Sequence, residues 1–374
     1  MAHSDLGAAE LEKVAGLDVD ANHYGLLIPK KFLEVGLKEV DHSSAELFQM
    51  LSKATVLPQE YLLRHGPDLN RRLVSLILDA VLEVEWEGEF VCGPASCKLL
   101  FDRRANDTES DHRLARCSRE ALRLACEVPI EEPVALSRWL YGYNAIPASP
   151  LWLSRLGSRD ENSQLGLEQG GRNHERLGVS YVSNRDDAWL SWTFNGKSRK
   201  KADGHLGYKL YISPHPRALM DSFATIVDSL IDSEVSDFKL GNGPLGLLRS
   251  DKLVVYLDSW NSLRELASVI EGALSGTAAQ GVPFTAPLTD NGLLSWGMDP
   301  PPQTHLSGWG EVQSWRYWLV NQLSRSILHA RARGACADDC LDYATTRLRL
   351  EGVDTELWLA SDQLWMVGRP NAWA

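Results

Sequence analysis

The sequence lacks the features of a membrane-spanning or secreted protein. No run of 18 apolar residues occurs in its 374 residues, so the pattern predicts no membrane-spanning helix. The N-terminal segment MAHSDLGAAELEKVAG has neither the basic start nor the apolar core of a signal peptide. Six cysteines are too few and too scattered to form a disulfide framework in a chain of this length. We therefore expect a cytoplasmic protein with reduced thiols.

Positive charge is also scarce. The chain has 38 lysines and arginines against 50 aspartates and glutamates, which gives a formal net charge of −12. Binding nucleic acid across a wide face needs a basic surface, so this balance argues against it. The exception is the segment FNGKSRKKADGHLG, which we interpret as an exposed hairpin loop. It is either a solvated run of charge or a clamp for an acidic or phosphorylated peptide, with Lys197, Lys200 and Lys201 as the candidate peptide-binding residues.

Motifs for metal and nucleotide binding are missing or incomplete. No histidine pair accompanies Cys336 and Cys340, and we predict neither a metal site nor a cofactor. Gly241, Gly243 and Gly246 match G-x-G-x-x-G after an expected strand. A dinucleotide-binding turn opens a helix, whereas a proline and the strand-like DKLVVY follow here, and the kinase motifs H-R-D and D-F-G are absent. The pattern therefore favours a hairpin connection whose glycines allow positive φ.

The order of the expected elements indicates an α+β fold. Residues 1–150 read as a mainly helical domain, with helices expected at 70–84, 111–126 and 133–143. Residues 151–187 lack periodicity, so we expect a linker or a mobile active-site loop. Residues 188–374 should form an α+β domain with a mostly antiparallel sheet. Its strands are expected at 188–194, 207–213, 236–240 and 251–257.

The stretch 208–256 carries the candidate site. It reads as strand, helix, strand, glycine loop and strand, and it contains Lys209, Tyr211, Lys239 and Arg249. Because strand side chains alternate between faces, Lys209 and Tyr211 should point to the same side. A lysine on an otherwise apolar strand is costly unless it is paired or used. The cations therefore either line one anion-sized pocket or form ordinary ion pairs, for which the candidate partners are Asp237, Asp251 and Glu234.

Several short motifs, in this order, resemble a known family. K-L-Y-I-S-P, F-K, L-R-x-D-K-x-V-x-Y, P-F-T-x-P and G-x-D-P-P follow one another within roughly residues 205–330. Together they resemble the HopA-type effector family of plant-associated bacteria, whose actinomycete relatives resemble the lyases of class V lanthipeptide pathways. A more distant likeness is to bacterial phosphothreonine lyases, whose pattern is K-x-H-x-S, then F-K, then an arginine. The resemblance implies a lyase-like α+β domain that eliminates phosphate from phosphoserine or phosphothreonine in a precursor peptide, leaving dehydroamino acids.

The resemblance also implies roles for individual residues. Lys239 matches the lysine that acts as base in the phosphothreonine lyases, and Lys209 and Arg249 match residues that contact phosphate. We add Arg316 as a further candidate phosphate ligand. A lysine is a base only when neutral, and both burial and nearby cations lower its pKa. This reaction needs no metal.

The candidate general acid differs from the one in the phosphothreonine lyase pattern. Tyr211 stands where the phosphothreonine lyases have a histidine, in agreement with the HopA-type family. His215 and His205, on either side of the strand, are alternative acids. Trp296, in the irregular segment 282–302, is the tryptophan that we expect to line a peptide-binding pocket.

Partners follow from the same resemblance. We expect a phosphorylated precursor peptide as substrate and a kinase as partner, with no role for nucleic acid or membrane. Two other classes of function stay open. One is a non-catalytic phosphopeptide-binding scaffold that works with a kinase, and the other is a host-targeted effector.

Overall fold

The computed structural model describes residues 23–27, 38–53, 55–100, 111–157, 162–195, 207–298 and 314–360. The basic segment with Lys197, Lys200 and Lys201, together with His205, lies outside these residues. All six cysteines are free thiols, as expected. Within the described ranges, no helix combines the length and the apolar character needed to cross a membrane.

The chain divides into two compact units at positions that differ from the expected boundary. One unit is Met1–Arg104 with His329–Tyr343, and the other is Ala105–Leu328 with Ala344–Ala374. The first division therefore falls at residue 105 instead of 150, and the helices expected at 111–126 and 133–143 belong to the second unit. A late segment returns to the first unit, which a division by sequence order alone does not predict.

The first unit combines helices with two small hairpins. Its core is a cluster of apolar side chains that includes Leu47, Leu69 and Leu76. The helix expected at 70–84 starts earlier and ends earlier, because the chain turns after Leu78 into the hairpin of β3 and β4. Its elements are β1 His23–Leu27, β2 Lys38–Asp41, α2 His42–Met50, α3 Gln59–Leu78, β3 Val84–Trp86, β4 Glu89–Val91, η3 Gly93–Ser96 and α4 Cys97–Leu100.

Helices account for much of the second unit. They are α5 Arg113–Glu127, α6 Pro133–Tyr141, α7 Pro150–Leu156, η4 Ser163–Leu165, α8 Arg172–Ser180, α9 Pro216–Asp232, α10 Gly243–Leu248 and α11 Trp260–Ala273. Further along the chain lie α12 Trp315–Ala332, α13 Ala337–Leu350 and the two-residue strands β12 Val353–Asp354 and β13 Leu359–Ala360.

The expectation of a linker at 151–187 is wrong. This segment contains most of α7, all of α8 and a sheet strand, which are too short to show a periodic pattern in the sequence.

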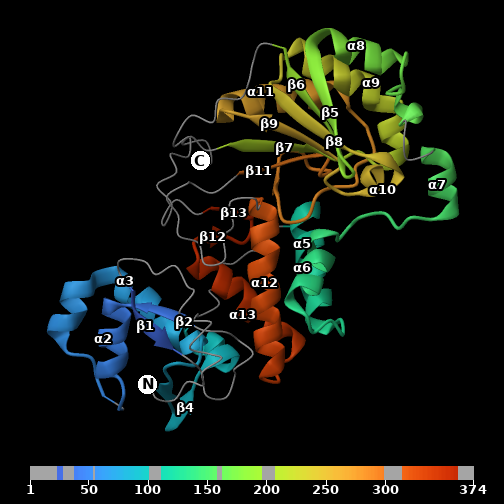
Figure 1. Cartoon of the computed structure of the whole chain (residues 1–374). Coiled ribbons are helices and arrows are strands. Elements are labelled where there is room, and N and C mark those ends of the chain that lie inside the picture. Colours follow the sequence, from blue (N-terminus) through green and yellow to red (C-terminus); the bar gives the residue numbers. More distant parts are fainter. Residues whose placement is uncertain are drawn as a thin grey trace, which may run out of the picture. The chain divides into compact units, whose positions relative to one another are not determined.

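A seven-stranded sheet forms the centre of the second unit (Figure 1). Its order is β10-β11-β7-β9-β8-β6-β5, and every neighbouring pair is antiparallel. The α+β class and the mostly antiparallel sheet are therefore confirmed, as are the four predicted strand positions. The strands are β5 Tyr181–Arg185, β6 Trp189–Phe194, β7 Tyr208–Ile212, β8 Asp237–Gly241, β9 Leu253–Leu257, β10 Ala286–Pro287 and β11 Leu294–Met298.

The two faces of this sheet have different chemistry. Leu210, Phe238 and Val255 lie opposite one another in the strand register and are almost completely buried. Helix α11 contacts β7 and β9 and packs against α9, so the helices cover this apolar face (Figure 1). Because neighbouring side chains alternate, Lys209 and Lys239 lie on the other face.

The glycine motif forms the expected connection between two antiparallel strands, but the connection contains a short helix. Residues Gly243–Leu248 are α10, which joins the antiparallel neighbours β8 and β9. Gly243 has φ +67°, which confirms the need for glycine there. Pro244 lies in the first turn, where a missing N–H is tolerated, so the proline starts a helix here.

The segment 282–302 is less irregular than expected. It contains β10 and β11, and Trp296 is in β11. Pro287 lies in β10 and Gly297 in β11, and only the tertiary pairing with β7 identifies β11 as a strand.

Gly246 provides a test of how α10 packs against β8. A Cβ on Gly246 would collide with the backbone of Gly241, so α10 can lie against β8 only through this glycine pair. We expect Gly246→Ala to lower the free energy of unfolding by about 1–3 kcal/mol, as other overpacked sites do, in urea denaturation. The control Gly272→Ala, in α11 with open space around it, should raise stability by about 0.4–1 kcal/mol. Equal stability of the two variants would contradict the close approach.

Candidate functional site

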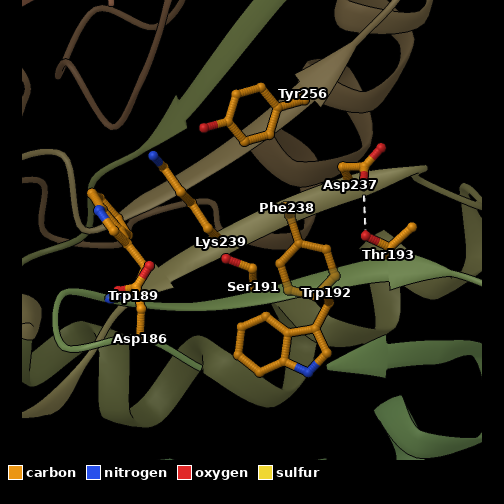
Figure 2. Close-up of a pocket in the computed structure, with 9 residues that line it drawn as sticks. All are labelled: Asp186, Trp189, Ser191, Trp192, Thr193, Asp237, Phe238, Lys239 and Tyr256. Atoms are coloured by element: carbon orange, nitrogen blue, oxygen red, sulfur yellow. Dashed lines mark hydrogen bonds between the residues drawn. The ribbon is translucent and has the colours of Figure 1, made fainter. Parts of the chain in front are cut away.

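A cavity of about 280 Å³ opens on the polar face of the sheet, over β6, β8 and β9. Figure 2 shows the amino group of Lys239 between the ring of Trp189 and the hydroxyl of Tyr256. The lining combines aromatic walls, hydroxyls, one lysine and two carboxylates. It consists of Asp186, Trp189, Ser191, Trp192, Thr193, Asp237, Phe238, Lys239 and Tyr256.

Lys239 is the half-buried cation of this cavity. Its Nζ lies 4.0 Å from the ring centroid of Trp189 and 5.6 Å from that of Tyr256. Among the described residues it makes no hydrogen bond or ion pair. Burial, and then the positive charge of Lys209, lowers the pKa of Lys239 to about 8. A substantial fraction of this amine is therefore neutral near physiological pH.

Lys209 is the second lysine on the same face. It is 8% exposed and lies directly opposite Tyr256 in the register of β7 and β9. Its Nζ is 5.8 Å from the ring centroid of Tyr256, so one tyrosine ring lies within 6 Å of both lysine amines. Sequence reasoning included Tyr256 in a motif but gave it no role. The alternation of β9 already places it on the face of Lys209, although nothing in the sequence shows that β9 lies between β7 and β8.

Asp251 organises the arginine side of the site. It is 4% exposed, and Arg249 reaches it with two hydrogen bonds, Nε–Oδ1 at 2.9 Å and Nη2–Oδ2 at 3.0 Å. Arg316 Nη1 and the Tyr141 hydroxyl donate to Oδ2 at 3.2 and 2.9 Å. Burial by itself would raise the pKa of Asp251, but the two guanidinium groups hold it well below its usual range. Burial, and then the charge of Asp251, raises the pKa of Tyr141 to about 12.

The two arginines that meet Asp251 have different surroundings. Arg316 is 2% exposed, and its Nε and Nη2 donate to the carbonyl oxygens of Pro283 and Tyr141. It therefore holds Asp251 in place and is not positioned to meet a ligand, contrary to the expectation of a phosphate ligand. The Arg249 side chain is 30% exposed, and its Cζ lies 4.5 Å from the ring centroid of Trp189, the ring that Lys239 also contacts. The structure thus brings together Lys209, Lys239 and Arg249 around two aromatic rings.

The acid candidates are placed differently from one another. Tyr211 is on the face of Lys209 and Lys239, is 6% exposed and packs against Val254 and Val282. His215 is the N-cap of α9, where its Nδ1 accepts a hydrogen bond from the backbone N–H of Arg217. It is not among the residues that line the cavity. Burial, followed by the charge of Lys252, lowers its pKa.

Trp296 does not line this cavity. It pairs with Leu210 in the sheet register, so it lies on the opposite face from Lys239. It is 4% exposed, and its ring centroid is 4.7 Å from that of Trp260 in α11. The expectation that Trp296 binds peptide is therefore wrong, because alternation along β11 turns it into the apolar core.

A second buried lysine, Lys252, has a structural role in this unit. Lys252 is fully buried, and its Nζ donates to the Pro214 carbonyl oxygen at 3.0 Å and to Gln280 Oε1. Burial lowers its pKa to about 7. Lys252 donates hydrogen bonds to two protein acceptors. Lys239 has no such acceptor among the described residues and lines the cavity, so it is available to a ligand.

No group of side chains suited to hold a metal ion occurs in the described part of the chain. The site instead offers two phenols and three cationic groups, one of which is an amine with a lowered pKa. Such a set can hold a phosphate group and can accept a proton next to it.

The effect of the Lys209 charge on the pKa of Lys239 can be tested by mutation. Removing a neighbouring positive charge favours protonation, so Lys209→Met should raise the pKa of Lys239 from about 8 towards the usual lysine value. An NMR titration of the lysine side-chain amines measures this shift. The control Arg264→Gln removes one exposed charge from α11, on the other side of the sheet, and should leave the pKa unchanged. A constant pKa in Lys209→Met would show that the two amines do not interact.

The buried network around Asp251 predicts that removing this carboxylate charge strongly lowers stability. Asp251→Asn removes the charge that compensates Arg316 and Arg249. We expect the free energy of unfolding to fall by about 3–5 kcal/mol, because one buried charge is then left without its partner. Urea denaturation measures this loss, and Asp221→Asn, on the exposed side of α9, should change stability by less than about 0.5 kcal/mol. Similar stability of both variants would show that Asp251 is not the centre of the network.

Comparison with known proteins finds similarity among solved structures. No protein-family model matches the sequence, and no curated protein matches it either. An effector protein from Pseudomonas syringae pv. syringae strain 61 has 12% identity and a TM-score of 0.37, over 66% of this chain and 98% of that chain. An effector protein from Pseudomonas syringae pv. tomato strain DC3000 has 14% identity and a TM-score of 0.37, over 66% and 97%. The Chromobacterium violaceum VirA (SpvC) phosphothreonine lyase effector has 15% identity and a TM-score of 0.27, over 56% and 96%.

The first two neighbours are described as effector proteins from Pseudomonas, and the third as a phosphothreonine lyase effector. At these identities and TM-scores, the roles given to Lys239 and its neighbours rest on their geometry in this chain.

Proposed function

We propose that this protein is a lyase that eliminates phosphate from phosphoserine or phosphothreonine residues of a peptide. The observation that carries the proposal is the state of Lys239, whose pKa is lowered to about 8 within a cavity next to Lys209 and Arg249. A site that only binds phosphate gains most from a fully charged lysine, whereas proton abstraction needs a neutral amine. The lowered pKa therefore favours catalysis over a non-catalytic scaffold.

The proposed reaction is a β-elimination. The neutral amine of Lys239 takes the Cα proton of the phosphorylated residue, and the electron pair of that C–H bond forms the Cα=Cβ double bond. The Cβ–O bond breaks, and its electron pair leaves with the phosphate. Lys209 and Arg249 stabilise the negative charge of the phosphate in the substrate and in the transition state. The products are a dehydroamino acid, inorganic phosphate and a protonated lysine, which then loses its proton to solvent.

The leaving phosphate is proposed to receive a proton from a phenol. Tyr211 and Tyr256 lie on the face of Lys239, and the Tyr256 hydroxyl points towards its amino group (Figure 2). His215 caps helix α9 and is not on a strand of this sheet face, which makes it the weaker candidate. We therefore assign the acid to this pair of tyrosines.

The biological substrate in this proposal is a ribosomal precursor peptide of a lanthipeptide pathway, phosphorylated by a partner kinase in the cytoplasm. The motif resemblance to class V lanthipeptide lyases supports this finer assignment. Elimination from phosphoserine would give dehydroalanine, and elimination from phosphothreonine would give dehydrobutyrine.

Incubation with phosphoserine and phosphothreonine peptides tests the reaction. Mass spectrometry should show loss of the elements of phosphoric acid, with inorganic phosphate released in equal amount. Lys239→Met should lower kcat by about 10²–10⁴-fold or more while phosphopeptide binding persists, because the base acts on the Cα proton. Arg249→Lys should weaken binding and turnover together, because Arg249 binds Asp251 through Nε and Nη2 and is proposed to contact phosphate through Nη1 in both states.

The pH profile gives an independent readout for the same residue. The rate should rise as pH passes through about 8 and level off above it, because only the neutral amine accepts a proton. Tight phosphopeptide binding by the wild-type protein without any elimination would overturn the lyase and favour a phosphopeptide-binding scaffold. Wild-type turnover in Lys239→Met would remove Lys239 as the base.

A further inference from the structure

The cavity extends along β8 from Lys239 to Asp237, whose charge is of the opposite sign. Asp237 lies two residues before Lys239 and therefore on the same face of the strand. Two residues of extended chain span about 7 Å. Ser191 and Thr193 of β6 lie directly opposite Lys239 and Asp237, and both line the cavity between the two charges (Figure 2).

The Asp237 carboxylate has one oxygen engaged and one oxygen without a hydrogen-bond partner. Oδ1 accepts a hydrogen bond from the Thr193 hydroxyl at 2.8 Å. Oδ2 is buried and has no hydrogen-bond partner in the structure. Among the residues that the structure describes, no lysine or arginine forms a salt bridge with this carboxylate. A buried carboxylate oxygen without a donor is costly, so a donor from a ligand would be strongly favoured there.

The spacing of the two charges matches the repeat of an extended peptide. Side chains at positions i and i+2 of an extended chain point to the same side and are about 7 Å apart. A peptide whose phosphorylated residue lies at Lys239 therefore brings the side chain two positions away close to Asp237. The carboxylate attracts a lysine or arginine there and repels an aspartate or glutamate.

We propose that Asp237, positioned by Thr193, forms a specificity subsite that selects a lysine or arginine two residues from the phosphorylated residue of the substrate. This inference rests on the proposed function, because it takes the substrate to be a phosphopeptide held at Lys239. It adds a requirement on the peptide sequence that the phosphate site by itself does not impose.

Binding of matched phosphoserine peptides to the Lys239→Met variant tests the subsite without turnover. The peptides carry lysine, glutamine or glutamate at position −2 or +2 from the phosphoserine, in an otherwise constant sequence. Isothermal titration calorimetry should show roughly three- to tenfold tighter binding of lysine than of glutamine at one of these positions. Glutamate should bind more weakly than glutamine, and added salt should reduce the differences.

Adding Asp237→Asn to this variant should make the affinities for the lysine and glutamine peptides equal, and this ratio is the readout. Asparagine has the same shape and can still accept the hydrogen bond from Thr193. Asp221→Asn, an exposed change on α9, is the matched control and should keep the preference. If Asp237→Asn fails to fold, the comparison of lysine and glutamine peptides in the parent variant decides the question.

Equal affinities for the lysine and glutamine peptides at both positions would overturn the subsite, even with phosphate elimination intact. A clear preference for lysine together with no elimination by the wild-type protein would overturn the lyase instead. The two failures are therefore distinguishable.

Discussion

The buried carboxylate of Asp251 accepts hydrogen bonds from two arginines and one tyrosine, and the geometry of the arginine side of the site depends on it. A carboxylate in the interior is unfavourable unless its charge is compensated and its oxygens are hydrogen-bonded. Arg316 supplies the compensation from within the core. Arg249 adds a second positive charge and, because its Nε and Nη2 are fixed on Asp251, presents its guanidinium to the ring of Trp189 in one orientation. The network thus keeps a net positive charge next to the cavity.

Lys209 and Lys239 add two more positive charges on the same sheet face, diagonally across β9. Like charges at this separation oppose folding, and burial increases the cost. The rings of Tyr256 and Trp189 offset part of it through cation–π contacts, but they accept no proton and form no ion pair. The fold therefore maintains an amine with a lowered pKa beside fixed positive charge, the combination that elimination of a phosphate requires. Asp237, further along the same strand, gives the cavity a negative end.

Local patterns in the sequence predicted most of the sheet. The strands around Trp192, Lys209, Lys239 and Val255 lie where alternation and β-branched residues placed them, and α9 and α11 follow the apolar spacing. The predictions failed where an element is short or where its identity depends on a distant partner. Helix α10 is too short to show a helical period, and β11 is a strand because it pairs with β7. Trp296 was misassigned for the same reason, since its direction depends on that pairing.

The sequence by itself determined the positions of the main strands and the phase of their alternation, because both depend on neighbouring residues. Local alternation alone therefore places Lys209 and Tyr211 on one face of the sheet. Only the tertiary structure decided that β9 lies between β7 and β8, which brings Tyr256 within reach of both lysines. Only the tertiary structure decided that Arg316 supports Asp251 and that Arg249 lies over the ring of Trp189, which lines the cavity. Strand order and burial result from contacts between residues far apart in the chain, and no local pattern encodes them.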